Sequence, residues 1–213
     1  MKLTIFGATG GTGVPTVRRA LDAGHEVTAV VRDPARLPSD LRACAEVVQA
    51  DIMDPAAIEA AVKGRDAVLT AVGTREGRAP TTVCADSTRS IVEAMTSAGT
   101  ERFVLVSASG PHPGPGDDPL TRFVVKPLVL ARLLRHAFAD MLAAEDITRR
   151  SGLGWTIVRP PRLTGGPGNG RYRKAVDRNV LGGASIARAD LAAALLDQAA
   201  DPSSIGHVVS VSG

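Results

Sequence analysis

Three glycines follow the first apolar run of the chain, at a spacing that suits phosphate binding. The run at residues 3–6 leads directly into Gly7, Gly10 and Gly13. Between a strand and a helix, the first glycine permits a sharp turn, the second lets a pyrophosphate approach the backbone, and the third lets the helix pack closely on the strand. Three glycines can also serve only a tight turn, but their place in the first strand–helix unit favours a dinucleotide site.

The residues between these glycines extend the predicted phosphate site. Backbone N–H groups at the start of a helix attract anions, and hydroxyl groups can add donors. Thr9 and Thr12 would supply such hydroxyls, although they could instead cap the helix. The candidate phosphate-binding residues are therefore Gly7, Thr9, Gly10, Gly11, Thr12 and Gly13.

Two arginines after the second predicted strand indicate which dinucleotide is bound. An NAD site usually has an acidic residue about 20 residues beyond the glycines, where it binds the ribose 2′-hydroxyl. This chain has Arg32 there and Arg36 one helical turn later. Guanidinium groups would bind a 2′-phosphate, which favours NADP (NADPH) as the cofactor. Asp33 is better read with Pro34 as the cap of a short helix, and the alternative for both arginines is an ordinary solvated surface.

Further candidates follow the other predicted strands, because ligands bind at the carboxyl ends of parallel strands. Residues after the third and fourth strands would lie beside the adenine and then along the cofactor towards its nicotinamide. Ser107 and Ser109, after the fifth, are the candidate catalytic residues, against the alternative that they only satisfy turn backbone. The remaining candidate cofactor-binding residues are Asp51, Ile52, Ala71, Val72, Gly73 and Pro160.

The elements that must position these residues alternate along the chain. Buried strands are predicted at residues 2–6, 26–31, 46–49, 67–71, 103–106 and 155–158, with helical segments between them. Alternation of this kind predicts one α/β domain over residues 1–213, with a doubly wound parallel sheet of Rossmann type. Residues 108–127 and 160–185 are predicted to be acceptor-site loops, and residues 160–170 are expected to be irregular. The first loop is rich enough in Gly and Pro to be a candidate lid.

Composition excludes several classes of partner. The net charge is only +3 and no basic run is interleaved with aromatic residues, so no nucleic-acid surface is expected. No apolar stretch is long enough to span a bilayer, and the first residues do not resemble a signal peptide, so a cytoplasmic protein without a membrane partner is expected. Cys44 and Cys84 lack metal-ligand spacing, so no metal site is predicted. A monomer is expected, with a dimer possible.

Several segments together resemble a known family. They are GATGGTG (7–13), VVRDPARLP (30–38), AVGTR (71–75) with PTTV (80–83), SGLGWTIVRPP (151–161) and ARADLA (187–192). The chain resembles the atypical short-chain dehydrogenases, in particular the NADPH-dependent flavin reductase, or biliverdin IXβ reductase, branch. The resemblance implies NADPH binding and hydride transfer to flavins, linear tetrapyrroles or other conjugated acceptors. The wider group includes NmrA-like proteins, which bind NADP without evident catalysis, so a non-catalytic NADP sensor is the alternative function.

The sequence departs from the reductase pattern near the expected acceptor. Ala108 stands where the family usually has a serine, Met141 replaces a basic residue, and Arg162 replaces a histidine. These differences leave the fold and cofactor expectations intact and bear on the identity of the acceptor.

The predicted acceptor is a conjugated one, because the usual acid for carbonyl reduction is missing. The only tyrosine, Tyr172, has no lysine four residues later. An isolated ketone needs such a Tyr–Lys pair to protonate the alkoxide that hydride addition leaves. A conjugated small-molecule acceptor, such as a flavin (FMN, FAD or riboflavin) or a quinone, instead delocalises the added charge over its ring. Three loop arginines, Arg75, Arg78 and Arg162, could attract an anionic acceptor, and His112 in the candidate lid could meet it.

Overall fold

The apolar run that precedes the glycines forms the central region of the sheet. In the computed structural model, which describes residues 1–74 and 79–213, β1 (Lys2–Phe6) is buried over four of its five residues. It pairs in parallel with β2 (Glu26–Val31) on one side and β4 (Ala67–Thr70) on the other. All six predicted strands are present, with bounds within one residue of those expected. β1 is the third of the eight strands, so the glycine turn that follows it opens between β2 and β4 at the carboxyl edge of the sheet.

The main sheet has eight strands and a second sheet has two. The main sheet is parallel except for β8, which is antiparallel to β10, and β7 and β9 pair in parallel. In sheet order the main strands are β3 (Glu46–Gln49), β2, β1, β4, β5 (Arg102–Val106), β6 (Gly154–Arg159), β10 (His207–Ser212) and β8 (Arg173–Val176); the small sheet contains β7 (Arg162–Thr164) and β9 (Ser185–Ala187).

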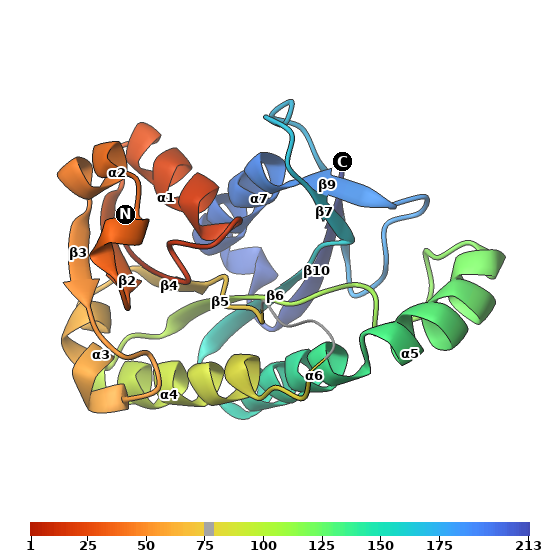
Figure 1. Ribbon diagram of the computed structural model, residues 1–213, viewed down its shortest axis with the longest axis horizontal. Helices are drawn as coiled ribbons and strands as arrows, with labels where there is room; N and C mark the ends of the chain where they lie inside the picture. The colour runs from red at the N-terminus through yellow and green to blue at the C-terminus, as the bar shows by residue number, and fades with distance from the viewer. Residues whose placement is uncertain (75–78) are drawn as a thin grey trace.

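Helices cover both faces of the sheet, as a doubly wound fold requires. One face carries α1 (Gly13–Asp22), α2 (Ser39–Cys44) and α7 (Arg188–Ala200), and the other carries α3 (Pro55–Val62), α4 (Val83–Ala98) and α6 (Arg135–Arg150) (Figure 1). Two clusters of buried apolar side chains, one on each face, form the core. The remaining helical segments are the short turns η1 (Pro34–Arg36) and η3 (Pro202–Ser204), the π-helical η2 (Thr121–Leu130) and α5 (Ala131–Leu133).

Polar side chains fix several helix starts. Asp54 accepts hydrogen bonds from the N–H groups of Ala56 and Ala57, as the predicted N-cap of α3. The start of α4 is held differently, because the buried carboxylate of Asp140 on α6 accepts from the N–H groups of Cys84 and Ala85. The N-terminus of α4 is therefore fastened to α6 beside the expected nicotinamide end of the site.

The predicted doubly wound parallel sheet is confirmed, with β8 as one antiparallel strand at its edge. Two expectations about the chain after residue 107 need correction. The stretch 160–185 is not wholly a loop, since it contains β7 and β8 and ends at the start of β9. The stretch 108–127 becomes helical from Pro119, and Asp118 accepts a hydrogen bond from the Thr121 N–H. Asp118 and Pro119 are the same helix-start signal as Asp54 and Pro55, and the Gly- and Pro-rich residues before them obscured it.

Candidate functional site

The glycine turn has the backbone geometry that a dinucleotide-binding turn needs. Gly7 has a φ of +75°, and a Cβ there would lie 2.8 Å from the carbonyl oxygen of Ala71. A Cβ on Gly13 would lie 2.0 Å from the Gly7 carbonyl oxygen, so the helix approaches the strand as closely as a glycine permits. A Cβ on Gly10 would meet only the Gly7 carbonyl oxygen, at 3.1 Å. Gly7 and Gly13 are therefore required by the fold, whereas Gly10 leaves space for a ligand.

The start of α1 offers free hydrogen-bond donors. Thr12 occupies the N-cap position, but its side chain makes no capping hydrogen bond. Among the described residues, no group accepts a hydrogen bond from the N–H of Gly11 or of Thr12. Unpartnered N–H groups at a helix N-terminus form a site for an anion such as a pyrophosphate.

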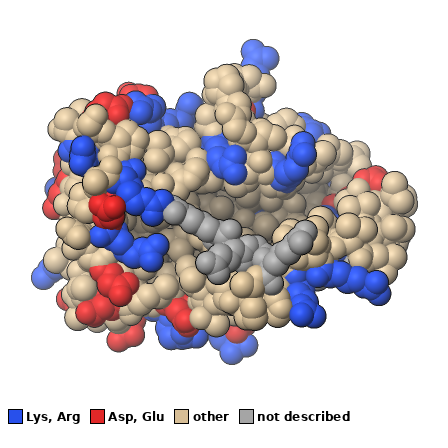
Figure 2. All heavy atoms as spheres, viewed as in Figure 1, with Lys and Arg blue, Asp and Glu red and all other residues tan. Residues whose placement is uncertain are grey.

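A cavity of about 620 Å³ opens beside this turn, along the carboxyl ends of β1, β2, β3 and β4. Its volume lies within the usual range for small-molecule sites. Figure 2 shows a hollow on this face of the molecule, with Lys and Arg side chains on its rim. Nine of the predicted cofactor residues line the cavity: Gly7, Thr9, Gly10, Arg32, Asp51, Ile52, Ala71, Val72 and Gly73. The donors, the missing Cβ of Gly10 and these strand ends fit a dinucleotide.

The two arginines after β2 do not share one position. Arg32 is exposed and lines the cavity, whereas Arg36 is exposed on η1 and does not line it. The carboxylate of Asp33 accepts a hydrogen bond from the Ala35 N–H at 3.0 Å, so it caps η1 as predicted. Of the two arginines, only Arg32 reaches the cavity.

One cation beside the glycine turn was not singled out from the sequence. A Cβ on Gly11 would lie 2.9 Å from Nε of Arg188, the first residue of α7. Arg188 makes no ion pair with a described residue. Its guanidinium lies against the glycine turn although Arg188 is far from that turn in the sequence. The only feature of the sequence that marked this region was the ARADLA segment (187–192), which was noted for the family resemblance.

The predicted catalytic serines lie at the end of β5, next to β6. The Ser107 N–H donates to the Val158 carbonyl, and the Ser109 N–H donates to the Pro160 carbonyl at 2.9 Å. Ser107 is buried, and its hydroxyl has no hydrogen-bond partner among the described residues. Neither serine lines the dinucleotide cavity, and neither does Pro160. The structure brings all three together through backbone hydrogen bonds.

A buried carboxylate organises this end of the site, and the sequence gave no local signal for it. Glu145 on α6 has no exposed side-chain surface. Its two oxygens accept from Nε and Nη2 of Arg159 at the end of β6, and Nη2 of Arg149 donates at 2.8 Å. Burial opposes its ionisation, but hydrogen bonds from His112 and Arg159 hold the pKa of Glu145 well below its usual range.

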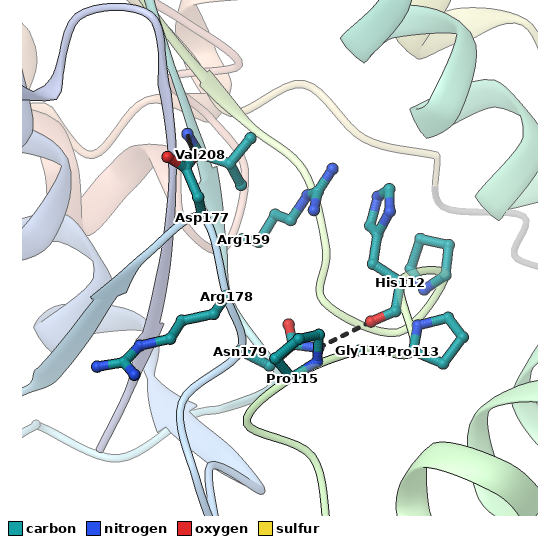
Figure 3. Close-up of a pocket in the computed structure, with 10 residues that line it drawn as sticks. His112, Pro113, Gly114, Pro115, Arg159, Asp177, Arg178, Asn179 and Val208 are labelled. Carbon is teal, nitrogen blue, oxygen red and sulfur yellow. Dashed lines mark hydrogen bonds between the residues drawn. The ribbon is translucent and has the colours of Figure 1, made fainter.

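A second cavity, of about 380 Å³, lies on the other side of the β5 end (Figure 3). Its walls come from the loop after β5, the end of β6 and the segment after β8. The lining residues are Pro111, His112, Pro113, Gly114, Pro115, Arg159, Asp177, Arg178, Asn179 and Val208. Arg162 is exposed on β7 outside both cavities, and the predicted Arg75 and Arg78 lie outside the described residues.

Comparisons with known proteins agree with this site. Residues 7–202 match the NAD(P)H-binding family, and the chain belongs to that family. It is 27% identical to the uncharacterised protein YwnB of Bacillus subtilis over 95% of this chain and 93% of the relative. It is 33% identical to the uncharacterised sugar epimerase YhfK of the same organism, over 83% of this chain and 79% of that protein.

A solved structure shows the same fold. A short-chain dehydrogenase/reductase from Veillonella parvula, in complex with NADP, superposes with a TM-score of 0.82 over 100% of this chain and 94% of its own, at 20% identity. The chain thus has a Rossmann fold of the kind seen in that structure. Within residues 1–74 and 79–213, no helix combines the length and the apolar character needed to cross a membrane.

Proposed function

We propose that this protein is an NADPH-dependent oxidoreductase that passes hydride to a flavin or a similar conjugated acceptor. The observation that carries the proposal is the dinucleotide cavity, whose lining includes both the glycine turn and Arg32. When bound, the reduced dinucleotide supplies the hydride. The chain holds its phosphates at the start of α1 and its adenosine end at Arg32 and Asp51.

The preference for NADPH is supported by the charge at the end of β2. Arg32 faces the cavity, and Asp33, the nearest alternative ligand for a ribose hydroxyl, is committed to capping η1. A guanidinium binds a 2′-phosphate through charge-assisted hydrogen bonds, which an unphosphorylated ribose cannot supply.

The proposal of a conjugated acceptor is supported by the hydrogen bonding and the position of Tyr172, the only tyrosine in the sequence. The Tyr172 hydroxyl donates to Oδ2 of Asp197 on α7 at 2.7 Å. Burial and this carboxylate raise the pKa of Tyr172 above its ordinary value, so the hydroxyl holds its proton. Tyr172 lines neither cavity, and it is therefore not the acid that an isolated ketone would need. An acceptor that delocalises the added charge requires less assistance.

The test measures NADPH oxidation with and without FMN, under air and under argon. We expect FMN-dependent oxidation under argon and little activity with simple aldehydes and ketones. Ser107→Ala and Ser109→Ala should lower turnover only modestly, because their proposed work is to position the nicotinamide and acceptor. NADPH binding without reduction of any flavin or quinone would replace this proposal with the non-catalytic NADP sensor. Ketone reduction that disappears with either serine would overturn the mechanism.

A further inference from the structure

The second cavity lies beside the ends of the strands that carry the proposed hydride-transfer site. The end of β4 lines the dinucleotide cavity, the end of β6 lines the second cavity, and β5 lies between them in the sheet. Ser107 and Ser109 follow β5 and are hydrogen-bonded to the chain at the end of β6. The second cavity is therefore separated from the end of β4 by one strand, β5, whose end the nicotinamide end of a bound dinucleotide would approach.

The walls of this cavity suit a planar ring. Pro111, Pro113, Pro115 and Val208 supply flat or branched apolar surface, and His112 and Arg159 supply polar groups. An apolar pocket with a few convergent polar groups is the usual form of a small-molecule site. Figure 3 shows the ring of His112 and the guanidinium of Arg159 next to each other, whereas Arg178 points away from them.

His112 is held at its backbone as well as at its ring. Its N–H donates to the Ser109 carbonyl at 3.2 Å, and its own carbonyl accepts from Nζ of Lys126 at 3.1 Å and from Nδ2 of Asn179 at 2.8 Å. Lys126 is itself buried in an ion pair with Asp117, at 2.8 Å. A loop histidine fixed from three elements has the preorganisation that a reacting group needs.

The ring of His112 is oriented by the buried carboxylate. Its Nε2 lies 3.2 Å from Oε1 of Glu145, and Nδ1 has no partner among the described residues. Arg159 and Arg149 bind the same carboxylate, so Glu145 cannot turn away. On the opposite wall, Asp177 pairs with Nδ1 of His207 at 2.7 Å. A carboxylate on one ring nitrogen fixes the ring so that the other nitrogen can exchange a proton with a ligand.

We infer that the second cavity binds the acceptor as a planar conjugated ring, and that His112, positioned by Glu145, donates the proton that accompanies the hydride. The inference rests on the proposed function. Bound NADPH would supply two electrons and one hydrogen to the acceptor as hydride and would itself become NADP⁺. A heteroatom of the acceptor ring takes a proton from Nδ1 of the His112 imidazolium, and solvent returns a proton to the imidazole.

The test uses the whole chain with NADPH, and FMN as the probe acceptor. In His112→Gln, the side-chain amide keeps a donor for Glu145 but carries no exchangeable acid at neutral pH. We expect kcat/KM for FMN in the wild type to fall as pH rises through the range in which imidazoles lose their proton. In His112→Gln it should be at least about tenfold lower at pH 6 and independent of pH over that range. His25→Gln is the matched control, because His25 precedes β2 at the opposite edge of the sheet.

A binding measurement separates the acceptor site from the chemistry. Without NADPH, FMN should shift the imidazole NMR signals of His112 and leave those of His25 unchanged. Glu145→Gln, which removes the charge that orients the ring, should lower the rate at pH 6 and bring the pH profile towards that of His112→Gln.

The results also distinguish the two proposals. Failure to bind NADPH, or to oxidise it with FMN, would overturn both the oxidoreductase assignment and the acid role. FMN-dependent oxidation with the same pH profile in wild type and His112→Gln would overturn the inference alone, even if the variant were slower. Unchanged His112 signals at saturating FMN would exclude FMN from the second cavity.

Discussion

Arg188 lies across the glycine turn, so that a Cβ on Gly11 would come within 2.9 Å of its Nε. The guanidinium, which forms no ion pair with the described residues, therefore stands beside the free N–H groups of the glycine turn, where dinucleotide phosphates would bind. Because the pyrophosphate is common to NADPH and NADH, Arg188→Ala should weaken both to a similar extent. Loss of one charge-assisted contact corresponds to about 1.5 to 3 kcal/mol, or roughly 10- to 150-fold in Kd. Cofactor titration checks this, with Arg18→Ala on the exposed side of α1 as the control.

Arg32 should contribute to the affinity for NADPH but not to the affinity for NADH. It lines the cavity at the end of β2, where a 2′-phosphate would lie. Arg32→Ala is expected to weaken NADPH by about 1.5 to 3 kcal/mol and to leave NADH nearly unchanged. Arg36→Ala is a close control, because Arg36 is exposed outside the cavity lining and its removal should matter less. Equal losses for NADPH and NADH in Arg32→Ala would contradict the NADP assignment.

The middle of the fold could be predicted because its signals are local. Short apolar runs such as residues 26–31 and 67–70 are buried on both faces, and each is bounded by a turn or a helix start that the sequence shows. The C-terminal strand β10, HVVSVS, was not predicted. Its serines Ser210 and Ser212 are buried, a placement that depends on neighbouring strands and cannot be read from the segment itself.

The residues of the site likewise include some that local sequence signals predict and some that only the tertiary packing brings there. Gly7, Arg32 and Ala71 directly follow strands, so a parallel sheet brings them to one edge. Arg188 and Glu145 belong to helices far along the chain, and only the packing of α7 and α6 carries them to the site. A single glutamate in a helix has no pattern that marks it as buried and paired.

Adding a side chain at Gly10 should abolish dinucleotide binding, whereas adding one at Gly13 should reduce the stability of the fold. Gly10→Val should leave a folded protein without dinucleotide binding, since the added atoms enter the space for the pyrophosphate and a Cβ meets only one backbone oxygen, at 3.1 Å. Gly13→Ala should destabilise the fold, because its Cβ would lie 2.0 Å from the Gly7 carbonyl oxygen. Circular dichroism and NADPH titration measure the two effects separately. Normal NADPH affinity in Gly10→Val would mean that the glycines form only a turn.

The two cysteines should differ in reactivity. Cys44 is exposed, whereas Cys84 is buried at the start of α4. Burial, reinforced by the Asp140 carboxylate, raises the pKa of Cys84 to about 12, so its reactive thiolate is scarce at pH 8. A disulfide reagent should therefore modify one thiol in the native protein and two after denaturation. Cys44→Ser should show no fast reaction, and fast labelling of that variant would place Cys84 at the surface.

Glu145 should make stability depend on pH in the acid range. Its arginine and histidine partners hold its folded-state pKa below the ordinary 4.5 of a glutamate. A lowered folded-state pKa contributes stability that is fully present above about pH 4.5 and is lost as pH falls towards the folded-state value. Glu145→Gln leaves Arg159 without its charged partner, so it should cost about 3 kcal/mol at pH 7. Urea unfolding between pH 7 and 3 should show that the difference in free energy of unfolding between the wild type and Glu145→Gln becomes smaller as pH falls. Glu93→Gln, at an exposed position on α4, should have the stability of the wild type at each pH. A stability difference between the wild type and Glu145→Gln that stays constant down to pH 3 would contradict the assigned role of the carboxylate.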